Sequence, residues 1–374
     1  MSFLNAENAE NAENAENAEN AEGRGRMGHT GGRASPLLST ALARARDSII
    51  GTELVEGALG QVKEIPLGDR LARLSPGHRS AALSAELLGD LTFSGDATSS
   101  TVHARSAVGE EGGKITATFA PLASLHRPSD EDFKRDLSLV ANYADLRGDR
   151  LAEVHTQLTD VLSFFGSIVY LQPHRAKWII ALLNAGLDLA TVVSQQMKLA
   201  LGCPRPIVFS SQLQPMIQTP DHGTYPSGHA TQAFMVATIL TELDGGNGAV
   251  LPDSQLFRMA SRIAINRTVA GVHFPSDSAA GAMLGITLGH YFVARAKGGG
   301  QKALHRSFHG ARYKDGEAAR DFHYEELRKL LDPPVDLAEE ARPATTGADF
   351  VVQDAPLLAS IWTRAAEEWA QRWR

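Results

Sequence analysis

The sequence is poor in cysteine, and its charged residues are more often acidic than basic. Cys203 is the only cysteine among 374 residues, so no disulfide can form within the chain and an oxidised scaffold is excluded. The 36 lysine and arginine residues face 43 acidic ones, a formal net charge of −7, which predicts no general attraction to nucleic acid. Any site for an anion must therefore be a local concentration of positive side chains.

The sequence also lacks a visible secretory signal and a convincing membrane span. After Met1 the chain runs into polar repeats, with no apolar stretch behind a basic start. The longest charge-free apolar runs, 178–186 and 278–294, are shorter than the roughly 20 apolar residues that a span needs. We therefore expect both runs to be core helices of a soluble protein without a membrane span, cytoplasmic by default.

Two regions of different composition divide the chain. Residues 5–22 repeat Asn-Ala-Glu without any large apolar residue, and Gly-Arg-Gly-Arg follows directly. Because such a segment cannot bury enough apolar surface to order itself, we predict that residues 1–35 form a disordered tail. Residues 36–374 have a globular composition and are predicted to form a single domain.

Apolar residues recur at steps of three and four over much of this domain, which indicates amphipathic or buried helices. The stretch 92–118 is instead rich in Ser, Thr and Gly, and predicts a loop or short strands. Few segments alternate with the period of two that half-buried strands show. The sequence therefore predicts an all-α fold with a helical bundle as its core. The expected helices cover residues 36–50, 130–145, 150–168, 177–201, 229–243, 278–296 and 357–374.

Three segments contain the residues that suggest chemistry: 198–206, 225–229 and 266–277. A tetrahedral oxyanion with two or three negative charges needs several fixed cations, because burial of an unpaired charge is very costly. Lys198, Arg205 and Arg267 would supply three. Each arginine brings a planar fork that matches two oxygens, and the lysine adds a point charge.

Neutral donors for the same anion are expected in the sequence Pro226-Ser227-Gly228. The proline is expected at the first position of the next helix. The hydroxyl of Ser227 and the free amides around Gly228 would then meet the anion at a helix N-terminus. Taken alone, Ser227 could equally be an ordinary helix cap.

Two histidines complete the constellation. One must bond the central atom of the oxyanion, and the other must move protons; His273 and His229 are the candidates. Asp277, four residues after His273, could accept a hydrogen bond from the second ring nitrogen and so fix the tautomer. Each residue alone has a structural interpretation, but the full set in this order favours an oxyanion site.

These segments resemble the three motifs of the superfamily of vanadium haloperoxidases and type-2 phosphatidic acid phosphatases. Lys-x6-Arg-Pro matches at 198–206, Pro-Ser-Gly-His at 226–229, and Arg-x5-His-x3-Asp at 267–277. Asn266 stands where the family usually has a serine. Segment 146–153 also resembles the haloperoxidases.

The resemblance implies a helical core over residues 177–297 and vanadate as cofactor. It implies His273 as the vanadium ligand, with His229 as the acid–base group and Asp277 as the partner of the ligand histidine. The implied reaction is the oxidation of bromide, with iodide or chloride as further options, by hydrogen peroxide to a hypohalous species that halogenates a small organic acceptor. The implied holders of the oxyanion oxygens are Lys198, Arg205, Ser227, Gly228 and Arg267.

The choice between the branches of the superfamily depends on one more residue. The position seven before the acid–base histidine tends to be histidine in bromoperoxidases and phenylalanine in chloroperoxidases, and here it is His222. His222 is thus a candidate catalytic residue that hydrogen-bonds the peroxide, or simply a loop histidine. A vanadium-dependent bromide peroxidase is the leading hypothesis. A soluble acid phosphatase acting through a phosphohistidine, and a protein that binds phosphate or vanadate without turnover, stay open, as does assembly into a homo-oligomer.

Overall fold

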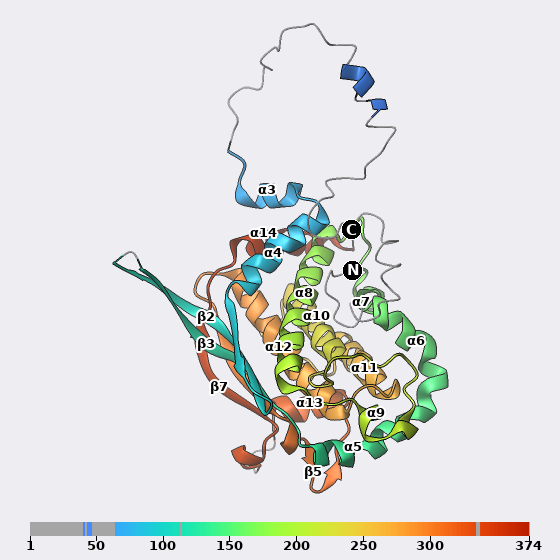
Figure 1. Ribbon diagram of the computed structural model, residues 1–374. Coiled ribbons are helices and arrows are strands. Elements are labelled where there is room, and N and C mark those ends of the chain that lie inside the picture. Colours follow the sequence, from blue (N-terminus) through green and yellow to red (C-terminus); the bar gives the residue numbers. More distant parts are fainter. Residues whose placement is uncertain (1–39, 42, 47–63, 113, 334–336, 374) are drawn as a thin grey trace.

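Long helices pack against one face of a five-stranded sheet in the computed structural model (Figure 1). The structure describes residues 40–41, 43–46, 64–112, 114–333 and 337–373. The predicted disordered tail lies outside the described residues, and so does most of the helix predicted over 36–50. The division into a tail and one domain therefore stays a prediction.

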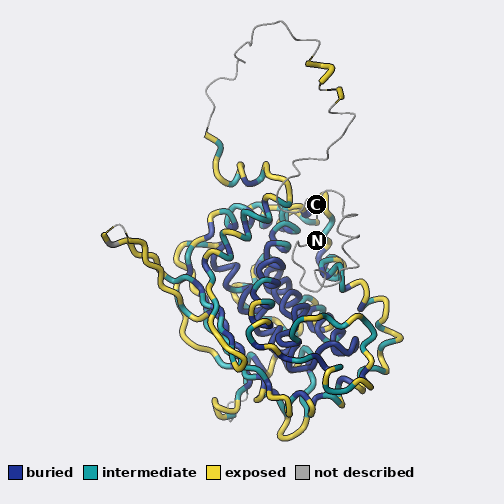
Figure 2. The backbone as a smooth tube through the Cα atoms, viewed as in Figure 1, coloured by how far each residue is buried: buried dark blue, intermediate teal, exposed yellow. Residues whose placement is uncertain are grey.

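Twelve helices are labelled in the part of the chain that the structure describes, and three of them form its centre. Helices α8, α10 and α12 are buried along most of their length, as the dark core of Figure 2 shows. Helix α10 contacts α8, α11 and α12, while α14 and α4 pack on α8. The helices are α3 (Leu67–Arg73), α4 (Pro76–Leu88), α5 (Asp130–Asn142), α6 (Arg147–Thr159), α7 (Leu162–Val169), α8 (Lys177–Leu201), α9 (Pro206–Phe209), α10 (Gly228–Leu243), α11 (Gln255–Val269), α12 (Pro275–Lys297), α13 (Tyr324–Leu331) and α14 (Pro356–Gln371).

Small residues allow α10 and α12 to approach closely. Gly281, Gly285 and Gly289 follow one another at steps of four on α12 and face α10. A methyl group on Gly285 would lie 2.3 Å from the carbonyl oxygen of Thr231, well inside van der Waals contact. Since α10 begins at the Pro-Ser-Gly-His motif and α12 begins at the His-x3-Asp motif, this packing also sets the distance between the two motifs.

We expect Gly285→Ala to destabilise the protein by about 2–3 kcal/mol, because the added methyl must push two buried helices apart. The measurement is chemical denaturation followed by circular dichroism. Gly148→Ala is the matched control, since a methyl at this exposed position of α6 meets nothing within 4 Å. The control should be neutral or slightly stabilising. Equal stability of the two variants would contradict the close-packing account.

The sheet contradicts the all-α prediction. Its strand order is β1-β2-β3-β4-β7; β3 and β4 are parallel and the other neighbours are antiparallel. Helices α8 and α12 cover its inner face, and the β2–β3 hairpin extends beyond the body (Figure 1). The fold is therefore a mixed α/β one. The strands are β1 (Leu91–Gly95), β2 (Ser99–Glu111), β3 (Lys114–His126), β4 (Lys302–His309) and β7 (Ala344–Val351), with β5 (Lys314–Asp315) and β6 (Ala318–Ala319) forming a separate small sheet.

Two features of β2 and β3 explain why the sequence does not show the alternation expected of strands. The register between β2 and β3 shifts at Val102/His103 and again at Arg105/Ala107. Each such irregularity reverses the phase of the inside–outside alternation, so no long period-two pattern survives. The outer halves of both strands are also exposed on both faces, which removes the apolar half of the pattern.

Several of the predicted helices are confirmed. The prediction over 177–201 matches α8, and those over 229–243, 278–296 and 357–374 match α10, α12 and α14 within three residues at each end. The helix predicted over 150–168 is wrong as a single element, because Asp160 adopts an extended conformation (φ −144°, ψ 96°) that separates α6 from α7. Helix α11 was not predicted.

One apolar segment meets the length and composition expected of a membrane span. Among the described residues it is Lys177–Phe209, and 67% of its most apolar window is buried inside the protein. A core helix of a soluble protein passes the same test, so the absence of a membrane span stays a prediction.

Candidate oxyanion site

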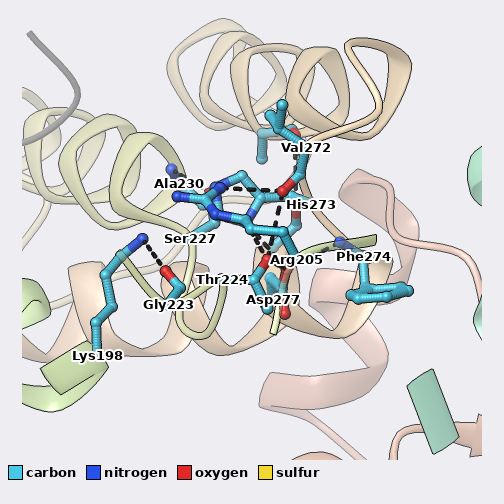
Figure 3. Close-up of polar contacts among 12 residues, drawn as sticks. Lys198, Arg205, Gly223, Thr224, Ser227, Ala230, Val272, His273, Phe274 and Asp277 are labelled. Carbon is cyan, nitrogen blue, oxygen red and sulfur yellow. Dashed lines mark hydrogen bonds and ion pairs between the residues drawn. The ribbon is translucent and has the colours of Figure 1, made fainter. Parts of the chain in front are cut away.

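The three predicted motifs meet where five helices end or begin. Lys198 lies on the last turn of α8 and Arg267 on the last turn of α11. Arg205 directly precedes α9, Ser227 is the N-cap of α10, and Asp277 lies on the first turn of α12. Figure 3 shows Lys198, Arg205, Ser227 and Asp277 converging with His273 on one centre. The structure thus brings together the residues that the sequence singles out.

Lys198 and Arg205 are buried, with 1% and 4% of their surface exposed, and they share a neutral partner. Nζ of Lys198 donates to the carbonyl oxygen of Gly223 (3.0 Å) and lies 3.1 Å from Nδ1 of His222. Nη2 of Arg205 lies 3.2 Å from the same Nδ1, and Nη1 donates to the carbonyl oxygen of Val272 (3.0 Å). These hydrogen-bond partners are neutral. Burial lowers the pKa of Lys198 well below its usual value and that of Arg205 to about 10, and the carboxylate of Asp277 offsets this only in part.

His222 therefore belongs to the site. Its Nδ1 faces two cationic donors, Lys198 and Arg205, and one acceptor, the carbonyl oxygen of Gly223 at 2.8 Å. Arginine can only donate and a carbonyl oxygen can only accept, so these contacts fit either tautomer of His222. Burial lowers the pKa of His222 to about 4, which keeps the ring neutral at physiological pH.

Arg267 is the most deeply buried cation of the three. Its Nη2 donates to Oε1 of Gln157 (3.1 Å) and to the carbonyl oxygen of Val154 (3.3 Å). Its Nε and Nη1 have no hydrogen-bond partner in the described part of the chain. Burial lowers the pKa of Arg267 to about 9. Buried, unsatisfied N–H groups on a cation are costly unless a ligand accepts from them, so this side chain fits an oxyanion.

The hydrogen bonds of His273 fix its tautomer. Nη1 of Arg205 lies 3.0 Å from Nε2, and because arginine only donates, Nε2 must carry a lone pair. Nδ1 then carries the proton and donates to Oδ2 of Asp277 (2.9 Å). The same Oδ2 accepts from Thr224 Oγ1 (2.5 Å) and from the amide of Phe274 (2.8 Å). Burial and Arg205 lower the pKa of His273 to about 3 despite Asp277, so the ring is neutral at physiological pH.

His229 has the opposite tautomer. Its Nε2 lies 3.0 Å from the carbonyl oxygen of Gln157, which can only accept, so Nε2 carries the proton of the neutral ring and Nδ1 its lone pair. Burial and the charge of Arg267 lower the pKa of His229 well below its usual range. The two histidines therefore present different nitrogens, as different chemical roles require.

Ser227 and Gly228 open α10, with one correction. Pro226 precedes the N-cap, so the predicted first-turn proline is wrong; Gly228 is the first helical residue. The hydroxyl of Ser227 accepts from the amide of Ala230 (3.4 Å), as in an ordinary cap. The anion-binding role of Ser227 and Gly228 stays a prediction based on their place at a helix N-terminus.

Sequence reasoning missed Thr224 and Gln157. Thr224 holds Asp277, and Gln157 contacts both Arg267 and His229. Neither residue lies in a motif, and a lone threonine in a loop or a lone glutamine on a helix has no signal of its own. Thr224 lies only two residues before Pro226, but the fold alone shows that this loop returns to Asp277.

Comparison with known proteins agrees with this geometry. The family model for the PAP2 superfamily matches residues 177–297. The decaprenylphosphoryl-5-phosphoribose phosphatase of Mycobacterium tuberculosis, found in strains CDC 1551 / Oshkosh and ATCC 25618 / H37Rv, is 30% identical over 146 residues. That alignment covers 39% of this chain and 75% of the phosphatase. The chain belongs to the PAP2 superfamily, whose members are phosphatases or haloperoxidases.

A solved structure of a bacterial vanadium-dependent iodoperoxidase is also similar, at 18% sequence identity and a TM-score of 0.34. The match covers 42% of this chain and 46% of the iodoperoxidase. A score this low does not establish a common fold, so the assignment to the superfamily depends on the motifs and the phosphatase relative.

Proposed function

We propose that this chain hydrolyses a phosphate ester through a covalent phosphohistidine at His273. The observation that supports this most directly is the pairing of Arg205 and Asp277 around His273, which keeps Nε2 unprotonated and facing Arg205 in a buried cationic site. The sequence alone favours a haloperoxidase. The 30% identity to a phosphatase reverses that order, because it is the relationship with the clearer bearing on activity.

The proposed reaction uses the histidines in turn. Nε2 of His273 bonds to phosphorus while the bond from phosphorus to the leaving oxygen breaks, and His229 donates a proton from Nδ1 to that oxygen. Water then attacks phosphorus and gives a proton to His229, the P–N bond breaks, and inorganic phosphate leaves. Lys198, Arg205 and Arg267 offset the charge on the phosphoryl oxygens.

Substrate binding would prepare His229 for its role. The pKa of His229 is lowered by burial and by Arg267. A phosphate dianion placed between the two side chains supplies opposite charge, which raises the pKa of His229 and favours the protonated form that the first step needs. Substrate binding thus favours the uptake, from water, of the proton that His229 then donates.

A second candidate is the vanadium-dependent bromide peroxidase, and the position of His222 favours it. His222 is a half-buried loop residue whose ring lies against Lys198 and Arg205. Vanadate has the shape and charge of phosphate, so the same cations, with Ser227 and Gly228, would hold it, and His273 Nε2 would be its ligand. Bound vanadate supplies a Lewis acid that activates hydrogen peroxide toward bromide.

Two assays in parallel separate the candidates. Purified protein is given p-nitrophenyl phosphate in one, and orthovanadate, hydrogen peroxide, bromide and a simple dione in the other. We expect hydrolysis that vanadate inhibits competitively, with no bromination. Vanadate-dependent bromination without hydrolysis would overturn the proposal in favour of the peroxidase. Tight phosphate binding without either activity would make the chain a binding protein.

A further inference from the structure

The C-terminal half of α6 contacts two residues of the candidate site, Arg267 and His229. Gln157, which is fully buried, contacts two site residues through two different atoms. Its side-chain Oε1 accepts from Nη2 of Arg267 (3.1 Å), and its main-chain oxygen accepts from Nε2 of His229 (3.0 Å). One residue thus holds the most buried cation and the proposed acid–base histidine.

The orientation of the Gln157 amide is itself fixed. Its Oε1 also accepts from Nδ2 of Asn266 (3.0 Å), and its Nε2 donates toward Oε1 of Glu153 (3.2 Å). Asn266 Nδ2 donates to Glu153 as well (2.9 Å). Two donors on one side of the amide and a carboxylate on the other allow only one assignment of its oxygen and nitrogen.

Arginines hold the outer side of this network. Arg262 forms two 2.7 Å hydrogen bonds with the carboxylate of Glu153, and Arg150 donates to Oδ1 of Asn266 (3.0 Å). Asn266 occupies the position at which the related motif usually has serine, and a serine side chain has too few donors to bridge Glu153 and Gln157. Arg150 and Glu153 belong to segment 146–153, which also resembles the haloperoxidases.

We infer that Gln157 is a positioning residue for the proposed reaction, an inference that depends on the proposed function. Its amide oxygen fixes the guanidinium of Arg267 through Nη2 and so reserves Nε and Nη1 for the oxyanion. Its main-chain oxygen keeps the proton of neutral His229 on Nε2 and so assigns proton exchange to Nδ1.

The neutrality of Gln157 is essential to this role. A carboxylate in contact with Arg267 would form a buried ion pair and remove the charge that attracts the oxyanion. The chain keeps its carboxylate one helical turn away, at Glu153, where Arg262 compensates it. The amide of Gln157 thus fixes the orientation of Arg267 and leaves its positive charge in place.

The test uses Gln157→Glu and Gln157→Leu, with Thr156→Ala on the exposed side of α6 as the control. Dissociation constants for inorganic phosphate are measured by calorimetry, with kcat, KM and melting temperature for each variant. In Gln157→Glu we expect the phosphate Kd and the KM to rise about 30-fold, because the introduced carboxylate would pair with Arg267. The melting temperature should fall in both variants, because each loses the hydrogen bond from Nε2 of Gln157 to Glu153. Gln157→Leu should raise Kd about tenfold, as Arg267 loses its fixed orientation. Both variants keep the main-chain oxygen, so the pH profile of kcat should keep its shape.

The outcomes are distinguishable. If Gln157 were only structural, Kd would follow the melting temperature, and Gln157→Glu would bind phosphate no more weakly than Gln157→Leu; that result would overturn the inference alone. If the wild type bound neither phosphate nor vanadate, the proposed function would fail and the inference with it. Thr156→Ala should match the wild type in every measurement.

Discussion

His273→Ala is expected to lower kcat for phosphate-ester hydrolysis by about ten-thousand-fold, because it removes the atom that bonds to phosphorus. Binding of inorganic phosphate should fall much less, since the three cations stay in place. Steady-state kinetics with p-nitrophenyl phosphate and calorimetric titration with phosphate measure the two effects. Substantial remaining hydrolysis in this variant would exclude the phosphohistidine route.

Asp277→Asn tests what the negative charge beside His273 contributes to the reaction. Oδ2 of Asp277 accepts from His273, Thr224 and Phe274, whereas Oδ1 has no hydrogen-bond partner among the described residues. An asparagine can therefore place its oxygen at Oδ2 and keep all three bonds, while it loses the negative charge. We expect a fall in kcat of only about 30-fold, which reflects a less basic Nε2 with the tautomer preserved. A loss as large as that of His273→Ala would show that the tautomer is not kept.

Arg267→Met is expected to raise stability and abolish oxyanion binding together. The guanidinium is fully buried, its pKa is lowered to about 9, and two of its nitrogens lack partners in the described part of the chain. Replacing such a desolvated cation with an apolar side chain should stabilise the protein by about 2 kcal/mol. Loss of its bonds to the phosphoryl oxygens should weaken phosphate binding by about 100-fold or more.

Thermal denaturation with and without phosphate tests both parts at once. Phosphate should raise the melting temperature of the wild type, because a ligand that binds only the native state stabilises it. Arg267→Met should start higher and gain nothing from phosphate. Arg258→Met, on the exposed side of the same helix, should keep the phosphate response of the wild type. A melting temperature of Arg267→Met below that of the wild type would contradict the account of an uncompensated buried charge.

The site was predictable from the sequence to a greater extent than the fold. A buried oxyanion site requires cations, so Lys198 and Arg205 could be identified from the sequence by their charge. The structure places these two residues together. Thr224 and Gln157 could not be found in this way, because they act on other side chains and no ligand chemistry demands their residue types. Their roles follow only from three-dimensional proximity.

The fold prediction failed where the pattern of burial was interrupted. Helices α8 and α12 have unbroken apolar sequences, and their extents were predicted closely. Strand β2 has two register irregularities and an exposed outer half, so its alternation disappears. Helix α11 has no such unbroken apolar sequence, because polar and charged residues, among them Arg258, Arg262 and Asn266, interrupt it.

The site is built from the ends of helices: α8 and α11 contribute their last turns, α10 and α12 their first. The remote end of each helix has no part in the chemistry. Evolution can therefore add or remove whole turns at those remote ends, or graft new segments there, without retuning the reaction. This separation confines the demands of the chemistry to a few helical turns and leaves the far ends of the helices to packing alone.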